Sequence, residues 1–394
     1  MNVITISREY GAGGGEAARR LAQTLGWELL DRELLHQAAQ VEHVPDADLE
    51  LLDEKAVSLA DRLRLHPPYQ KYIRGLTEAA RQAAAKGNVI LVGRGTRQLL
   101  GDLPNACHVR LVASKDWRVQ RMANFEGVSV EQALAKCLEI DHTRDRFTRY
   151  FFGAEAGAPE QYDVVFNTGR IALDDVVACV TALVKGAWPV ELGQQLVPHV
   201  LTLSRQLGAG DTGLAPTLAG RLGMRAYDRE LLEQEALRLG VTAQEIEQVD
   251  EQPSGIFQRF RSGSLQQRYF EVLGQLMNEL ATRGNVILVG RGGNRFLRDR
   301  PEAFHVRSVA SMPIRIQRVM EHRWVREQQA KNLISQSDTQ RQLFFSRTFG
   351  EDWASPLEYH LVVNLGRLGP AAVDLIAFAA EAHWVRVTKK GGDG

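Results

Sequence analysis

The sequence predicts an α/β protein of two tandem domains, each with a mainly parallel β-sheet of about five strands and helices on both faces. The chain has 394 residues, and because domains average about 150 residues, two or three domains are expected. Short apolar, β-branched runs alternate with segments of helical periodicity, which is typical of parallel sheets covered by helices. A long internal repeat then sets the number of domains at two.

The repeat is the most informative feature of the chain. The nine residues from Gly87 to Gly95 recur unchanged from Gly284 to Gly292, 197 positions later. The same offset relates Ser7–Arg8 to Ser204–Arg205, Gly11–Gly13 to Gly208–Gly210, Asp31–Leu35 to Asp228–Leu232, and Val112–Ser114 to Val309–Ser311. Solenoid repeats have periods of about 20–50 residues, so this period indicates a duplicated domain. We expect domains at 1–187 and 199–386, a linker at 188–198, and a flexible tail at 387–394.

In the first half, strands and helices are expected to alternate. Val3–Ser7 is a β-branched run and predicts a buried strand. After a glycine-rich turn, apolar residues at helical spacing from Ala17 to Leu25 predict a helix that ends at Gly26. Further strands are expected at Trp27–Leu30, Val89–Val92, Cys107–Val112 and Val164–Asn167, and helical segments at 41–86 and Trp117–Tyr150.

The composition argues against several classes of function. Basic and acidic residues both number 48, so the formal charge is zero, and binding to nucleic acid or to a membrane by bulk charge is not expected. No apolar run approaches the roughly 20 residues of a membrane helix. The three cysteines form no C-x-x-C pair, which argues against disulfides and structural zinc and favours a reducing, cytoplasmic setting.

A glycine-rich loop follows the first strand of each half. Gly11-Ala12-Gly13-Gly14-Gly15 corresponds to Gly208-Ala209-Gly210-Asp211-Thr212. Backbone N–H groups of such a loop, with the positive end of the next helix, can cradle a phosphate. The phosphate-loop motif G-x-x-x-x-G-K-[ST] places lysine and Ser/Thr after its last glycine. Gly14 and Gly15 stand there in the first half, and Asp211 and Thr212 in the second.

Three segments of the first half together resemble one known family. They are Ile4–Gly14, Val92–Gly95 and Tyr162–Thr168. They look like the cytidylate kinase-like family, a branch of the P-loop nucleoside monophosphate kinases, and the resemblance covers nearly the whole chain, twice. It implies two tandem P-loop NTPase-like domains that bind ATP with Mg²⁺. It further implies that they phosphorylate CMP or dCMP, or descend from enzymes that did.

The resemblance also implies roles for single residues. Arg94 matches the arginine that holds the monophosphate in such kinases, although the aspartates that flank that arginine are replaced by Val92 and Gly95. Asp141 with Arg144 matches an Asp-x-x-Arg pair at the substrate phosphates, where the planar fork of arginine suits phosphate. Arg8 lies beside the loop and could partly substitute for the absent lysine. The second-half equivalents are Arg205, Arg291, Asp338 and Arg341.

Plainer interpretations of these residues stay open. Arg94 and Arg291 could be surface or capping arginines, and the two Asp-x-x-Arg pairs could be ordinary ion pairs between residues i and i+3. No convincing Mg²⁺ ligand appears in the first half, whereas Thr212 could serve in the second.

The most favoured function is transfer of a phosphoryl group from ATP to a nucleoside monophosphate, with the ATP phosphates on Gly11–Gly15. The first half is favoured as the nucleotide site because Asp211 would put a negative charge beside a phosphate in the second. The alternative is a non-catalytic nucleotide-binding or regulatory protein, which the missing lysines favour. In a third interpretation the second half is only a structural partner. The halves are expected to pair within the chain, and a homo-oligomer is compatible with the sequence.

Overall fold

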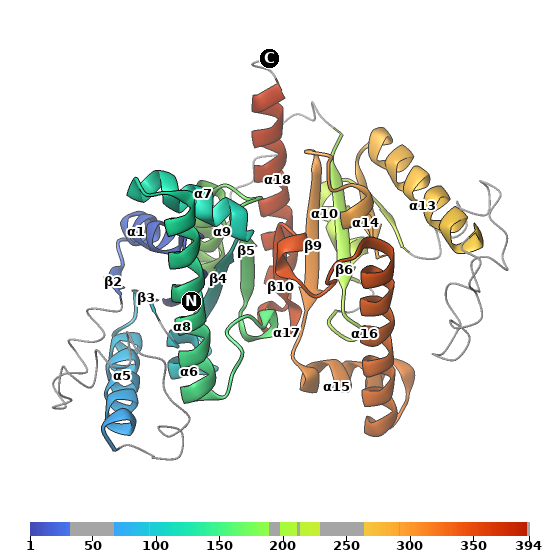
Figure 1. The fold of residues 1–394 in the computed structure, drawn as a ribbon. Helices are drawn as coiled ribbons and strands as arrows, with labels where there is room; N and C mark the ends of the chain where they lie inside the picture. Colours follow the sequence, from blue (N-terminus) through green and yellow to red (C-terminus); the bar gives the residue numbers. More distant parts are fainter. Residues whose placement is uncertain are drawn as a thin grey trace. The chain divides into compact units, whose positions relative to one another are not determined.

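The computed structural model describes residues 1–31, 67–93, 95–188, 198–210, 213–228, 264–290 and 292–391. The chain forms two compact units (Figure 1). Unit 1 comprises Met1–Pro189 and His360–Ala371, and unit 2 comprises Val190–Tyr359 and Ala372–Gly394. Unit 1 therefore takes in a short segment of the second repeat.

The described sheet of unit 1 is mainly parallel. Its strands are β1 (Val3–Arg8), β2 (Glu28–Leu30), β3 (Val89–Val92), β4 (Ala106–Val112), β5 (Val164–Asn167) and β10 (Leu361–Asn364), in the spatial order β2-β3-β1-β4-β5-β10. β1 to β5 run parallel, and β10 runs antiparallel to β5. β1 and β3 are buried along almost their whole length because a parallel strand inside the sheet is covered on both faces.

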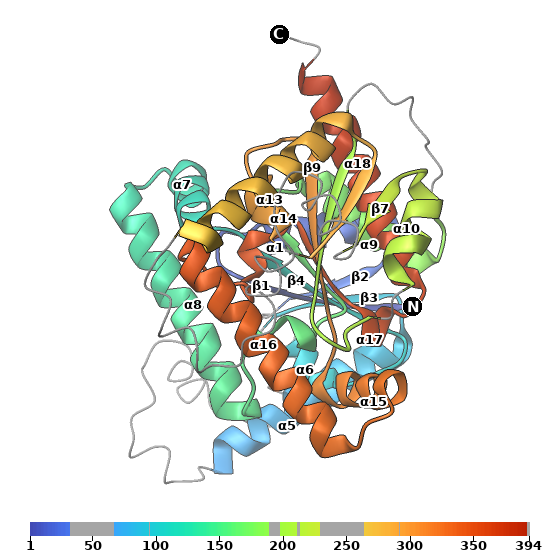
Figure 2. The same cartoon turned by 90° about the vertical axis from the view of Figure 1, so that its right-hand side faces the viewer.

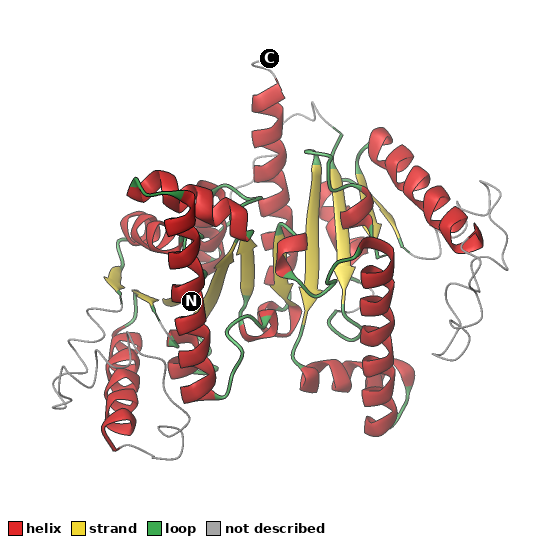
Figure 3. Cartoon of the chain, in the orientation of Figure 1, coloured by secondary structure: helices red, strands yellow, loops and turns green. Residues whose placement is uncertain are grey.

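Helices cover both faces of this sheet (Figure 3). They are α1 (Gly14–Leu25), α5 (Pro67–Lys86), α6 (Thr96–Leu100), α7 (Lys115–Glu126), α8 (Val130–Phe152), α9 (Leu173–Lys185) and α17 (Leu365–Leu368), with a 3₁₀ turn at Pro159–Gln161. Val3, Val89 and Leu91 pack against α5 and α6 in one buried cluster. Side chains alternate between the faces of a strand, so Ile4 and Ile90 point to the opposite face, which α1 covers.

The helical segment expected at Trp117–Tyr150 is divided into two helices, α7 and α8, which pack against each other (Figure 2). Gly127 ends α7 with a φ of 68°, in the left-handed region that glycine adopts readily. Ser129 and Gln132 then start α8 with a reciprocal capping box. The break follows from local chemistry, and it gives α7 and α8 separate directions next to the glycine-rich loop.

Unit 2 repeats the plan. Its described strands are β6 (Val200–Arg205), β7 (Arg225–Tyr227), β8 (Val286–Val289) and β9 (Ala303–Val309), parallel to one another in the order β9-β6-β8-β7. Its described helices are α10 (Leu214–Leu222), α13 (Ser264–Arg283), α14 (Gly293–Phe296), α15 (Met312–Arg323), α16 (Glu327–Phe349) and α18 (Ala371–Gly391), with a 3₁₀ turn at Pro356–Glu358. Leu273, Leu280 and Leu288 belong to its core, at positions equivalent to Leu76, Ala83 and Leu91 in the core of unit 1.

These sheets and their covering helices confirm the predicted α/β class. None of the helices in the described ranges is both long and apolar enough to cross a membrane.

Candidate functional site

The loop between β1 and α1 has the backbone conformation of a phosphate cradle. Gly11 and Gly13 have φ angles of 81° and 85°, where a side chain would be strained. α1 begins at Gly14, and no side chain of the described residues caps its N-terminus, whereas Ser129 caps α8. The first turn of α1 therefore offers N–H groups to an anion. The loop and this first turn lie at the carboxyl end of β1, the edge at which ligands bind in open α/β sheets.

Two elements distant in sequence hold this loop. A Cβ atom at Gly11 would lie 2.9 Å from Met122 Cγ and 3.1 Å from Arg118 Cβ, so α7 leaves no room for a larger residue there. The Thr168 hydroxyl, which follows β5, donates a hydrogen bond to Ala12 O over 2.9 Å. The loop is thus fixed by the fold of the whole unit.

Arg8 lies across Gly14, the position at which the phosphate-loop motif has lysine. A Cβ atom at Gly14 would lie 2.7 Å from Arg8 Cγ and 2.8 Å from Arg8 Cβ. The stem of Arg8 and a side chain at position 14 therefore exclude each other. A Cβ atom at Gly15 would meet only Arg19 Nη1, at 3.8 Å. The Arg8 stem, from β1, therefore fills the position where the Cβ atom of the motif's lysine would lie.

Two arginines of α7 donate hydrogen bonds to loop carbonyls. Arg118 Nη1 lies 2.8 Å from Tyr10 O, and Arg121 Nη1 lies 3.0 Å from Gly11 O. The Arg118 side chain is only 9% exposed, so its charge must be matched inside the fold. Both arginines are additions to the residues expected from the sequence. The available signal is that both recur at the repeat offset, as Arg315 and Arg318.

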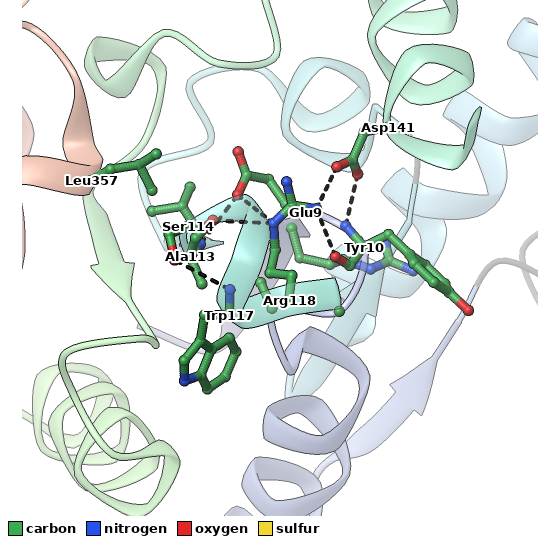
Figure 4. Close-up of polar contacts among 12 residues, drawn as sticks. Glu9, Tyr10, Ala113, Ser114, Trp117, Arg118, Asp141 and Leu357 are labelled. Carbon is green, nitrogen blue, oxygen red and sulfur yellow. Dashed lines mark hydrogen bonds and ion pairs between the residues drawn. The ribbon is translucent and has the colours of Figure 1, made fainter. Parts of the chain in front are cut away.

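Two carboxylates match the charge of Arg118 (Figure 4). Asp141 Oδ1 accepts a hydrogen bond from Tyr10 N at 2.7 Å, and Asp141 Oδ2 accepts one from Arg118 Nη1 at 2.6 Å. Glu9 Oε2 accepts one from Ala113 N at 3.1 Å and lies 3.3 Å from Arg118 Nε. Burial raises the pKa of Glu9, against the lowering effect of Arg118. Asp141 thus ties α8 to the loop backbone and to α7 at once.

Arg144 lies one helical turn after Asp141. Its Nη1 donates a hydrogen bond to Arg8 O over 3.1 Å, and its Cζ is 5.7 Å from the centroid of the Tyr10 ring. Arg144 Nη1 is 4.0 Å from Asp141 Oδ1, a longer contact than the one Arg118 makes with the same carboxylate. The structure therefore brings Arg8, Asp141 and Arg144 together at the end of β1, with Arg118 as the nearer partner of Asp141.

The same framework recurs in unit 2. Arg315 donates hydrogen bonds of 2.8 Å to both carboxylate oxygens of Asp338 and to Leu207 O. Arg341 Nη1 donates a hydrogen bond to Arg205 O, as its equivalent does in unit 1. Burial lowers the pKa of Arg341 to about 10.

The loop of unit 2 is described only as far as Gly210. Gly208 has a φ of 78°, and Arg318 Nη1 donates a hydrogen bond to Ala209 O at 2.5 Å. The remaining expected site residues lie outside the described residues: Arg94, Arg291, Asp211 and Thr212.

The carboxylates beside the first loop do not form a protein-built Mg²⁺ site. Across the described ranges, no group of three or more His, Cys, Asp or Glu residues could hold a metal ion. Asp141 and Glu9 accept the hydrogen bonds given above, and Glu16 is ion-paired with Arg20 and Arg121. Mg²⁺ commonly reaches phosphoryl-transfer sites on the nucleotide phosphates and keeps several waters.

One family model matches each of the two repeats of this chain. The model of the cytidylate kinase-like family matches residues 3–170 and 200–367. The cytidylate kinase of Pyrococcus horikoshii is 24% identical over 190 residues, which are 48% of this chain and 91% of that protein. A uronate isomerase of Corynebacterium glutamicum is 26% identical over 129 residues, which are 33% of this chain and 24% of the isomerase.

A solved structure of an uncharacterized protein from Eubacterium ventriosum shares 22% identity, with a TM-score of 0.38 over 47% of this chain and 99% of that one. A likeness at this score carries no weight. The family model, by contrast, covers most of this chain, in two copies separated by the offset of the repeat. The chain therefore belongs to the cytidylate kinase-like family, as a tandem duplication.

Proposed function

We propose that the chain is an ATP-dependent kinase that phosphorylates a nucleoside monophosphate of the CMP or dCMP type, in its first repeat. The observation that carries the proposal is the N-terminus of α1, which has no side-chain cap and follows Gly11 and Gly13. Arg8 and Arg144 lie beside it, at the end of β1. Phosphoryl transfer depends mainly on positioning and on stabilising charge, and this arrangement supplies both. The named activity of the Pyrococcus relative supports the same reaction.

In this proposal the amides of Gly11–Gly15 bind the ATP phosphates. Arg8 supplies the cation that lysine supplies in other phosphate loops, because its stem lies on Gly14 and leads toward the loop. Mg²⁺, bound with ATP, adds charge neutralisation at the phosphates.

Arg94 and Arg144 bind the acceptor phosphate in this proposal. Arg144 is held at the end of β1 by its hydrogen bond to Arg8 O, and its side chain stays 21% exposed. Arg118 and Asp141 are positioning residues, because their contacts are with the loop backbone and with each other.

We further propose that the two repeats act as domains 1–187 and 199–386, with a linker at 188–198, and work as a pair in the cytoplasm. The antiparallel pairing of β5 with β10 supports a pair within one chain, since β10 comes from the second repeat. Assembly of chains into a homo-oligomer is compatible with this arrangement.

The test is release of ADP from ATP in the presence of CMP, dCMP, UMP or AMP. We expect turnover with CMP or dCMP, its loss in Arg94→Ala, and its retention in the matched variant Arg291→Ala. Activity lost only in Arg291→Ala would move the site to the second repeat. Binding of ATP without turnover of any monophosphate would contradict a kinase.

That last outcome would favour the second candidate, a non-catalytic nucleotide-binding or regulatory protein. The observation behind it is Gly14, which leaves the loop of the first repeat without its lysine. Under this alternative ATP binds to the loop and no monophosphate is phosphorylated. Arg94→Ala and Arg291→Ala then leave the affinity for ATP unchanged.

A further inference from the structure

Trp353 contacts the carboxyl end of β6 in unit 2. It is 4% exposed, and its Nε1 donates a hydrogen bond to Ser204 Oγ over 2.9 Å. Ser204 is the penultimate residue of β6, four residues before Gly208 of the glycine-rich loop. The indole is therefore buried at the carboxyl end of the strand, where a parallel sheet binds its ligands.

Two arginines flank the indole. Arg307 Cζ lies 4.5 Å from its ring centroid, and Arg341 Cζ lies 5.5 Å from it. An aromatic ring attracts an arginine cation, most strongly where water is excluded. Nucleobases are held by the same contact, with an arginine plane against the ring. The indole thus gives these arginines the cation–π contact that a bound nucleobase would give them.

The equivalent residue of unit 1 is Ala156, whose side chain ends at Cβ. The backbone is held alike in both units: the Tyr162 hydroxyl donates to Ala156 O at 2.9 Å, and the Tyr359 hydroxyl donates to Trp353 O at 3.1 Å. Arg144, the counterpart of Arg341, has no indole at this position in unit 1. The side chain at this position is thus one difference between the units, and a second is Tyr10, whose ring centroid lies 5.7 Å from Arg144 Cζ and whose counterpart in unit 2 is Leu207.

We propose that Trp353 occupies the acceptor-nucleotide position of the second repeat, so that one chain binds one monophosphate, in the first repeat. The inference rests on the proposed function, because it treats Arg144 and Arg341 as acceptor-side arginines. A nucleotide entering unit 2 would have to displace a buried aromatic side chain, and such side chains contribute heavily to core packing.

The test is the number of CMP molecules bound per full-length chain, measured by isothermal titration calorimetry. We expect one in the unaltered chain and two in Trp353→Ala. One additional CMP in the variant supports the inference, and an unchanged number overturns it. None in the unaltered chain and one in the variant would support Trp353 as the occupant of the second-repeat position but would overturn the proposed first-repeat site. One CMP in the unaltered chain and one in the variant would overturn the inference but leave the proposed first-repeat site standing. No CMP in either chain would overturn both the inference and the first-repeat site.

A second variant tests the same inference without touching unit 2, in case Trp353→Ala does not fold. Ala156→Trp should weaken CMP binding at least tenfold. Gly157→Trp is its matched control, because Gly157 is exposed and a Cβ there meets nothing within 4 Å. The control should bind CMP within twofold of the unaltered chain. Unimpaired binding in Ala156→Trp, or equal losses in both variants, would overturn the inference.

Discussion

The two repeats share the framework of the loop and differ in the residues around it. Arg118 and Arg315 each join their loop carbonyl to an aspartate of the long helix, with closely similar hydrogen bonds. Tyr10 and Ala156 of unit 1 correspond to Leu207 and Trp353 of unit 2. Contacts that hold the backbone are needed for folding in both copies. If the second repeat binds no monophosphate, as proposed above, positions that face the ligand in the first repeat are free to change in the second.

The units also differ because unit 1 contains residues of the second repeat. Arg367 comes from the second repeat but lies in unit 1, where its Nε is 2.8 Å from Asp163 Oδ1 and its Nη1 is 2.7 Å from Asp102 Oδ1. The Asp163 side chain is only 3% exposed. The position of Asp163 in the second repeat holds His360. Unit 1 therefore contains a buried carboxylate that forms an ion pair with an arginine of the second repeat.

Arg367→Ala should produce the largest loss of stability. Removing one partner of a buried ion pair leaves the other charge uncompensated, at a cost of about 3–5 kcal/mol. The hydrogen bond from His108 N to Asp163 Oδ2 remains and favours the lower end of that range. The free energy of unfolding, from urea titration of the full chain, measures the effect.

Arg20→Ala is the control for this variant, because its two partners, Asp174 and Glu16, are 71% and 34% exposed. Such a pair contributes about 0–1 kcal/mol. Equal losses in the two variants would show that Asp163 does not depend on Arg367. A chain cut to residues 1–187 lacks Arg367 as well and should unfold at lower urea concentration than the full chain.

Gly14→Ala should have the next largest effect, and it acts on nucleotide binding. The added Cβ displaces the stem of Arg8, and overpacking of this kind costs about 1–3 kcal/mol. Gly15→Ala, one residue along the same helical turn, meets only Arg19 at 3.8 Å and should change ATP affinity little. Calorimetric titration with ATP compares them.

The pair Arg8→Ala with Gly14→Lys sharpens this test. If Arg8 and a lysine at position 14 exclude each other, the double variant should bind ATP more tightly than Gly14→Lys alone. Additive losses would mean that the two positions are independent.

The strands are the most predictable part of the fold. β3 and β5 occupy the residues expected for them, because buried parallel strands are short continuous apolar runs. Helical periodicity alone predicts one long segment where the structure has α7 and α8. The signals for the division are local, in Gly127 and the capping box of Ser129, and periodicity does not register them.

The site is predictable only where a motif marks it. The glycine loop and the Asp141–Arg144 spacing can be recognised in the sequence, whereas the contacts of Arg118 depend on how α7 packs against the loop. Likewise, nothing local indicates that Arg367 belongs to unit 1, because its partners are 204 and 265 residues away. Contacts of this range follow from the assembled fold.

The smallest effect is expected from Glu9→Gln, which makes unit 1 resemble unit 2. Gln206 accepts a hydrogen bond from Ala310 N at 3.4 Å, at the position where Glu9 accepts one from Ala113 N. Burial raises the pKa of Glu9 above its ordinary value of 4.5. A raised pKa in the folded state means that stability is fully present below the unfolded pKa and is lost as pH rises through the folded one.

The unaltered chain should therefore lose stability relative to Glu9→Gln as pH rises from about 4 to 7, because only the unaltered chain must keep a buried carboxylate charged. The difference is small because Arg118 opposes it and the Glu9 side chain is 25% exposed. Free energies of unfolding at both pH values measure it. Gln206→Glu is the mirror variant and should introduce the same loss in unit 2. A difference between the unaltered chain and Glu9→Gln that does not change with pH would mean that Arg118 fully offsets the burial of the carboxylate.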